Sequence, residues 1–149
     1  MTSYLTKAIL AIFIVVPFSF AQTRQGLKSK YGAPDSKGRI IVRQGIGLSA
    51  SFDEKGNPSK FILMPLEPGK NNQPSAMPKE SSLGALEEIC PVKTRGRSSS
   101  TFREERSCSL TEITKFEKVT IQIQNRCQLR GGGIYSIQIT WPTKLKFTN

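Results

Sequence analysis

Histidine is absent from the chain: none of its 149 residues carries an imidazole. Without histidine there can be no Ser-His-Asp or Cys-His nucleophile system and no histidine-ligated metal site. Cysteine is scarce, because three cysteines are too few for a four-cysteine zinc site and their spacings match no metal motif. The composition therefore excludes the commonest hydrolase and zinc chemistries, and we expect no metal and no other cofactor.

Acidic residues are also few, with 11 Asp and Glu against 22 Lys and Arg. The adjacent Glu87 and Glu88 fall on a predicted helix, where neighbouring side chains point about 100° apart, so they do not form a working carboxylate pair. Asp53 and Glu54 fall in a predicted turn. No catalytic motif is present. The sequence favours a protein that is not an enzyme, although a lysine- or serine-based mechanism stays open.

The chain begins with the features of a cleavable signal peptide, residues 1–21. Lys7 precedes an unbroken apolar run, 8–16, and small residues stand three and one positions before a cut between Ala21 and Gln22. The run is shorter than the roughly 20 residues of a membrane-spanning helix, and no cysteine follows the cut to carry a lipid. We therefore expect export to the periplasm or the medium without a stable membrane anchor; an uncleaved anchor is the alternative.

The exported chain is strongly basic. Its net charge of +11 becomes +10 after cleavage, because the removed segment holds one lysine and no acid. Such an excess favours an anionic glycan, a wall polymer or an acidic protein surface as partner, and we do not expect nucleic acid. The alternatives are a wall- or glycan-acting enzyme or inhibitor-like effector, and a structural protein whose dispersed cations keep it soluble. The oligomeric state is left open.

The first half of the exported chain predicts a polar arm followed by strands. Residues 22–37 are polar and are expected to form a flexible, loosely held arm. A short strand is expected at 39–43. A hairpin follows, because apolar residues alternate over 46–52, turn formers fill 53–58 and an apolar strand returns over 59–64.

A single helix is predicted over residues 79–90, after a proline-rich linker at 67–78. Its apolar residues recur at three- and four-residue steps and therefore share one face. These residues are Leu83, Leu86, Ile89 and Cys90. Pro91 ends the helix.

The last third of the chain predicts a second hairpin. Apolar residues alternate over 119–123 and 135–141, on either side of a glycine-rich turn at 128–133. Tyr135 and Trp141 share the apolar row, so core packing is favoured over an aromatic binding platform. The fold class is therefore α+β: one domain, 38–149, in ββ-α-ββ order, with an antiparallel sheet of two hairpins covered on one face by a single helix.

A basic, serine-rich connection, 92–109, is expected to be mobile and is the candidate anion-binding site. Around a flexible glycine, Arg95 and Arg97 could clamp a phosphate, sulfate or carboxylate. The full candidate set is Lys93, Arg95, Arg97, Arg103 and Arg106. The alternative is a solvated loop, whose cations pair with nearby glutamates such as Glu104, Glu105 and Glu112.

The three cysteines predict one disulfide in an oxidising compartment. Cys108 and Cys127 flank the strand around Ile121 and are the favoured pair; closing that loop would stabilise the fold by about 3 kcal/mol in the chain-entropy model. Cys90 lies on the apolar face of the predicted helix and is expected to be a buried thiol. A reactive or intermolecularly bridged Cys90, and a competing Cys90–Cys108 pair, are the alternatives.

Several short motifs occur between Tyr31 and Trp141. They are a Tyr-Gly-Ala-Pro start at 31–34, a Val-Arg-Gln-Gly-Ile strand entry at 42–46, a Pro and an Arg-Gly after the helix, and a cysteine pair around a strand. Together they resemble a group of small exported bacterial proteins of unassigned function, common in Acidobacteria. Members of that group often carry a cysteine in the second hairpin strand, which residues 60–64 lack here. The resemblance implies export and a fold group, and supplies no catalytic residue.

Overall fold

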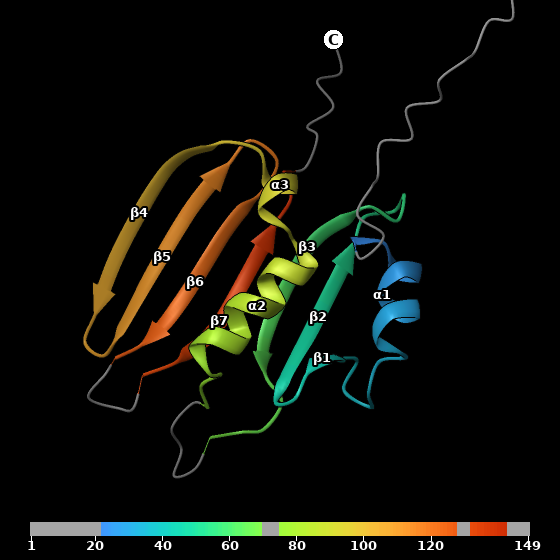
Figure 1. Ribbon diagram of the computed structural model, residues 1–149, viewed down its shortest axis with the longest axis horizontal. Helices are drawn as coiled ribbons and strands as arrows, with labels where there is room; N and C mark the ends of the chain where they lie inside the picture. The colour runs from blue at the N-terminus through green and yellow to red at the C-terminus, as the bar shows by residue number, and fades with distance from the viewer. Residues whose placement is uncertain (1–21, 70–74, 128–131, 143–149) are drawn as a thin grey trace, which may run out of the picture.

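The computed structural model describes residues 22–69, 75–127 and 132–142. They form one seven-stranded antiparallel sheet in the order β1-β2-β3-β7-β6-β5-β4, with three helices (Figure 1). The predicted α+β class and antiparallel sheet are confirmed. The arrangement of two hairpins under a single helix is wrong in detail, because further strands flank the two hairpins on both sides of the sheet and two helices lie beside the predicted one.

The segment predicted as a loosely held arm contains helix α1 (Arg24–Tyr31). The Thr23 side chain accepts a hydrogen bond from the Gly26 N–H at 2.9 Å and caps the helix. Leu27 is fully buried in the core. A helix of eight residues depends on such packing, because its own backbone hydrogen bonds are too few to hold it.

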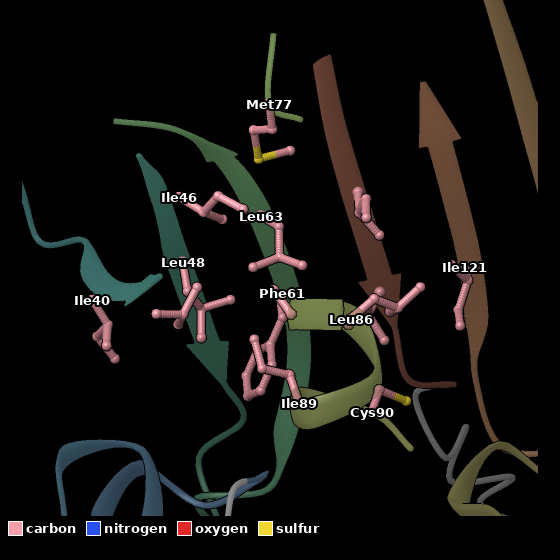
Figure 2. Packing of buried hydrophobic residues seen from close by; sticks show 14 of the residues in the cluster. Ile40, Ile46, Leu48, Phe61, Leu63, Met77, Leu86, Ile89, Cys90 and Ile121 are labelled. Atoms are coloured by element: carbon pink, nitrogen blue, oxygen red, sulfur yellow. The ribbon is translucent and has the colours of Figure 1, made fainter. Parts of the chain in front are cut away.

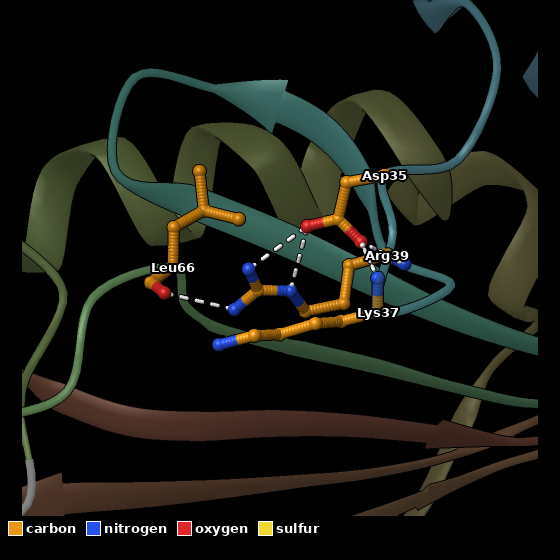
Figure 3. A network of polar contacts seen from close by, with 4 residues as sticks. All are labelled: Asp35, Lys37, Arg39 and Leu66. Carbon is orange, nitrogen blue, oxygen red and sulfur yellow. Dashed lines mark hydrogen bonds and ion pairs between the residues drawn. The ribbon is translucent and has the colours of Figure 1, made fainter.

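The Asp35 carboxylate holds the segment between α1 and the first strand in place through several hydrogen bonds (Figure 3). Asp35 accepts hydrogen bonds from the backbone N–H of Lys37 at 2.9 Å and of Arg39 at 2.8 Å. The Arg39 guanidinium donates to Asp35 at 2.8 Å and to the Leu66 carbonyl at 2.8 Å. These bonds, the Arg39 backbone donor first, lower the pKa of Asp35. They tie the end of the predicted arm to the residue that follows β3.

The first three strands are β1 (Ile40–Arg43), β2 (Ile46–Phe52) and β3 (Pro58–Pro65), joined as antiparallel neighbours. The predicted strand at 39–43 and the first hairpin are confirmed to within two residues at each end. A bulge interrupts the pairing of β1 between Ile41 and Arg43.

The predicted helix is confirmed as α2 (Lys79–Ile89), followed by the single turn α3 (Val92–Arg95). All three helices lie on one side of the sheet, with α2 crossing β7 and β3 (Figure 1). Ala85, Leu86 and Ile89 are buried on α2, and so is Cys90 directly after it. Leu86, Ile89 and Cys90 lie against the sheet (Figure 2). Strand residues such as Phe61 complete this core.

The remaining strands are β4 (Ser98–Arg106), β5 (Ser109–Phe116), β6 (Thr120–Arg126) and β7 (Ile134–Thr140). The last two confirm the strands of the second predicted hairpin; the turn predicted between them falls largely on 128–131, outside the described residues. The connection predicted as mobile, 92–109, instead forms α3 and β4. Pairing with β5 along the whole of β4 supplies the hydrogen bonds that fix it as a strand.

Candidate functional site

Arg95, the centre of the predicted anion clamp, is built into the core. It is 9% exposed. Its Nε donates to the Cys90 carbonyl at 2.8 Å and a terminal nitrogen donates to Glu87 Oε2 at 2.8 Å. The guanidinium also lies 5.9 Å from the centre of the Phe116 ring. Arg95 therefore holds α3 and the end of α2 together, and two of its donors are engaged within the fold.

The other predicted arginines pair with glutamates. Ion pairs join Arg97 to Glu117 at 3.0 Å, Arg103 to Glu112 at 3.0 Å and Arg106 to Glu104 at 2.6 Å. These pairs follow the alternative in which the cations of 92–109 are neutralised by nearby acids. Exposed pairs of this kind are worth little stability. They do reduce the charge available to a ligand.

The predicted set is not gathered into one site. Arg97 precedes β4 and Arg106 ends it, so the two lie nine positions apart, about 30 Å along an extended strand. Arg103 and Arg106 differ by three positions and therefore lie on opposite faces of the strand. Lys93 lies apart on α3 and is exposed, without an acidic partner among the described residues.

A different constellation appears on the face of the sheet turned away from the helices, which we call the outer face. Directly paired residues of neighbouring strands lie on the same face. The pairing register therefore assembles one row across six strands, which we call the lysine row. It consists of Ser51, Lys60, Thr140, Thr120, Lys115 and Ser100.

A second row lies beside the lysine row on the outer face, and we call it the glutamine row. It consists of Ser49, Ile62, Gln138, Gln122, Ile113 and Phe102. The Gln138 amide donates a hydrogen bond to the Thr140 hydroxyl at 3.3 Å and so joins the two rows. Amides and hydroxyls in this arrangement offer both donors and acceptors to a ligand.

The outer face is open to solvent. Every residue of the two rows is half-buried or exposed. On the opposite face, the adjacent row of Phe61, Ile139 and Ile121 is buried beneath the helices. Among the described residues, one face of the sheet therefore makes the core, and no helix covers the other.

The charge of the outer face is positive. Lys60 and Lys115 have no acidic partner within the part of the chain that the structure describes. Among the described outer-face residues of β2 to β7, Glu104 is the one acidic residue. It forms an ion pair with Arg106 at 2.6 Å. Arg126, opposite Ser109, adds a further cation at one end of the face. Sequence reasoning did not select the outer-face lysines, because no local pattern distinguishes them from other exposed lysines.

Two glutamates of α2, Glu87 and Glu88, are engaged in structural contacts. Glu88 accepts from Arg43 Nε at 3.1 Å and from the Tyr31 hydroxyl at 3.2 Å, while Glu87 accepts from Arg95 and from the backbone N–H of Val92. The hydrogen bond from Arg43 is the main cause that lowers the pKa of Glu88. No three Cys, Asp or Glu side chains are placed to hold a metal within the described ranges.

The predicted disulfide is confirmed. Cys108 and Cys127 are bonded, with 5.0 Å between their Cα atoms, and the Cys127 N–H donates to the Cys108 carbonyl at 3.1 Å. The bond joins the β4–β5 turn to the end of β6. The competing Cys90–Cys108 pair is not formed: Cys90 is a buried free thiol, and burial raises its pKa.

The fold and the site define a small antiparallel-sheet protein with one face closed by helices and one face open and basic. Comparison with family models, with curated proteins and with solved structures finds no match to this chain. Among the helices of the described residues, none is long and apolar enough to cross a membrane.

Proposed function

We propose that this chain is an exported, non-catalytic binding protein whose outer face holds an extended anionic polymer, such as an acidic glycan or a wall polymer. The observation that carries the proposal is the lysine row. Within the described ranges, it sets two lysines that have no acidic partner on a face that no helix covers, with Thr120 and Thr140 between them.

The spacing of the lysines favours a polymer over a small anion. Lys60 and Lys115 are three strand positions apart, and neighbouring strands are about 4.8 Å apart, so their backbones are separated by about 14 Å. One polymer chain that crosses the strands could contact both ammonium groups through charges on different units. A single phosphate or carboxylate would occupy one lysine and leave the other unused.

The residues between the lysines favour a sugar polymer. Threonine hydroxyls and glutamine amides can exchange hydrogen bonds with sugar hydroxyls. Surfaces that bind single-stranded nucleic acid combine cations with several aromatic side chains on which bases stack. In the lysine and glutamine rows the one aromatic residue is Phe102, at the edge of the sheet. The outer face therefore has the chemistry of a glycan site more than that of a nucleic-acid site.

Two features support the exported location. The chain begins with the pattern of a cleavable signal peptide, and the Cys108–Cys127 disulfide suits an oxidising compartment. A basic protein released there would meet anionic polysaccharides at cell surfaces.

The test compares two double variants that lose the same charge. Lys60→Ala with Lys115→Ala removes both outer-face lysines, whereas Lys28→Ala with Lys93→Ala removes exposed lysines from α1 and α3. The exported chain, 22–149, is applied to immobilised heparin and to immobilised polygalacturonate, and the salt concentration at elution is measured. We expect the first variant to elute at clearly lower salt than the second, because only the first loses contacts to the polymer.

Two results would contradict the proposal. Equal losses in the two variants would mean that net charge alone governs retention, and the outer face would not be the site. Failure of the unaltered protein to bind either polymer would remove polyanion binding as the function. Arg95→Ala is not used, because Arg95 supports the core.

A further inference from the structure

Strand β4 is an open edge of the sheet. It is nine residues long, it pairs with β5 on one side, and it lies last in the strand order. Eight of its nine residues are exposed, and Phe102 at its centre is 61% exposed. Such an edge offers unpaired backbone N–H and C=O groups to another strand.

The opposite edge of the sheet is protected. Strand β1 has four residues, a bulge interrupts its pairing, and α1 packs beside it (Figure 1). Short, bulged and covered edges are the usual means by which proteins avoid pairing with other chains. The two edges therefore differ, and only β4 is long and uncovered among the described strands.

The sequence of β4 is complementary to itself in the antiparallel sense. It reads SSST-F-REER, with four hydroxyl residues before Phe102 and four charged residues after it. When two copies pair about Phe102, each charged residue faces a serine or threonine of the other copy. Arg103 faces Thr101 and Glu104 faces Ser100, for example. Phe102 faces its own counterpart, and no like charges are directly opposed.

We infer that β4 pairs with β4 of a second copy about a two-fold axis at Phe102, giving a symmetric dimer with one continuous sheet. The contact is isologous, so both copies use the same surface and the assembly closes at two. Because Phe102 lies on the outer face in both copies, the two outer faces lie on the same side of the joined sheet. The inference does not depend on the ligand proposed above.

Charge does not oppose this contact. Charged side chains on an edge often prevent pairing, but β4 carries two arginines and two glutamates and has no net charge. Arg103 is paired with Glu112 and Arg106 with Glu104. The charge of +10 on each exported chain is therefore not concentrated where the copies meet.

The edge is also held in shape before it pairs. The disulfide between Cys108 and Cys127 fixes the β4–β5 turn to the end of β6. A preformed edge loses less conformational entropy on association. The bulge between Ser98 and Ser100 lies at the start of the strand, so the central residues, 100–104, remain regular. Because an edge contact is small, we expect a dissociation constant on the order of micromolar.

Single cysteines test the pairing register. Phe102→Cys places a thiol on the proposed axis, where opposed Cα atoms at about 4.5–5.5 Å suit a disulfide. We expect Phe102→Cys to form a disulfide-linked dimer under mild oxidation, seen on a non-reducing gel. Thr101→Cys and Arg103→Cys, which would face themselves only in shifted registers, should link far less. The control is Ile41→Cys, 53% exposed on the opposite edge.

Sedimentation equilibrium of the exported chain measures the dimer without a crosslink. We expect a monomer–dimer equilibrium in the unaltered protein and at least a tenfold weaker one in Phe102→Lys, which opposes two cations on the axis. Circular dichroism checks that this exposed substitution leaves the fold intact. A monomer from about 1 to 500 μM, or a dimer that Phe102→Lys leaves unchanged, would overturn the inference. Preferential linking through Thr101→Cys, Arg103→Cys or Ile41→Cys would overturn it equally.

Discussion

The sheet has two halves that differ in the side chains on the face turned toward the helices. Strands β1, β2, β3 and β7 lie beneath α2 and form the covered half. Strands β6, β5 and β4 form the bare half. One row of directly paired residues crosses all seven strands on this face. In strand order it consists of Ile40, Leu48, Leu63, Ile137, Ile123, Glu112 and Arg103. The first four are buried, Ile123 is half-buried, and the last two form an exposed ion pair at 3.0 Å.

The change along this row shows that the two halves are stabilised by different means. In the covered half, apolar side chains are removed from water by α1 and α2, and this burial supplies most of the stability. In the bare half, Ile121 of β6 is still buried in the core, whereas β5 and β4 depend on backbone pairing, cross-strand polar contacts and the Cys108–Cys127 bond. Polar positions on both faces of β4 and β5 leave that half free to make external contacts.

The largest expected effect comes from a matched pair of phenylalanines. Phe61 is fully buried in the covered half and Phe102 is 61% exposed in the bare half. Phe61→Ala should lower the free energy of unfolding by about 3–5 kcal/mol, because it leaves a cavity in the core. Phe102→Ala should change it by no more than about 0.5 kcal/mol. Urea unfolding at low protein concentration, where the chain is monomeric, measures both. Similar losses in the two variants would contradict the division of the sheet.

The disulfide should matter to the bare half in particular. Cys108→Ser with Cys127→Ser opens a loop with a sequence separation of 19, and we expect a loss of about 3 kcal/mol. Amide hydrogen exchange should quicken in β4, β5 and β6 by more than in β2 and β3, because local openings follow the loss of local constraint. Uniform quickening throughout the sheet would show that the disulfide supports the whole fold instead.

The strands and the helix that bury an apolar row are also the elements that the sequence predicts. Strands β2, β3, β6 and β7 place apolar residues on alternate positions, and α2 shows helical spacing, because each buries one face. Strands β4 and β5 bury no complete face, so β4 falls within the predicted connection, 92–109, and no element is predicted for β5. Helix α1 was not predicted, because Leu27 is its one fully buried apolar side chain. A single apolar residue cannot show the spacing that indicates a helix.

The candidate sites could likewise be predicted only in part from the sequence. The Cys108–Cys127 pair could be predicted, because the two cysteines flank one strand. The pairing of Arg95 with Glu87 and of Arg97 with Glu117 depends on how α3 packs, which local sequence does not reveal. The lysine row depends on the register of β3 with β7, where Lys60 meets Thr140 across 80 positions of the chain. The register between strands that lie far apart in the sequence is determined by the packing of the whole sheet.

The smallest expected effect concerns the ion pairs that join helices to the covered half. Glu88 on α2 contacts Arg43 of β1, with Tyr31 at 3.2 Å and Lys30 at 3.7 Å from α1. Its folded pKa lies below the ordinary value of 4.5, chiefly because of the hydrogen bond from Arg43. A lowered carboxyl pKa stabilises the fold above the unfolded pKa, and that contribution is lost as the pH falls through the folded pKa.

Glu88→Gln should therefore be less stable than the unaltered protein at pH 7 by at most about 1 kcal/mol, because the pair is partly exposed. The difference should shrink as the pH is lowered below 4.5 and the unaltered carboxyl becomes protonated. Glu112→Gln is the matched control, because it removes the partner of the more exposed Arg103 in the bare half. Urea unfolding at several pH values measures both. If Glu112→Gln lost as much stability at pH 7 as Glu88→Gln, ion pairs would contribute equally to the two halves. The helix contacts would then no longer set the covered half apart.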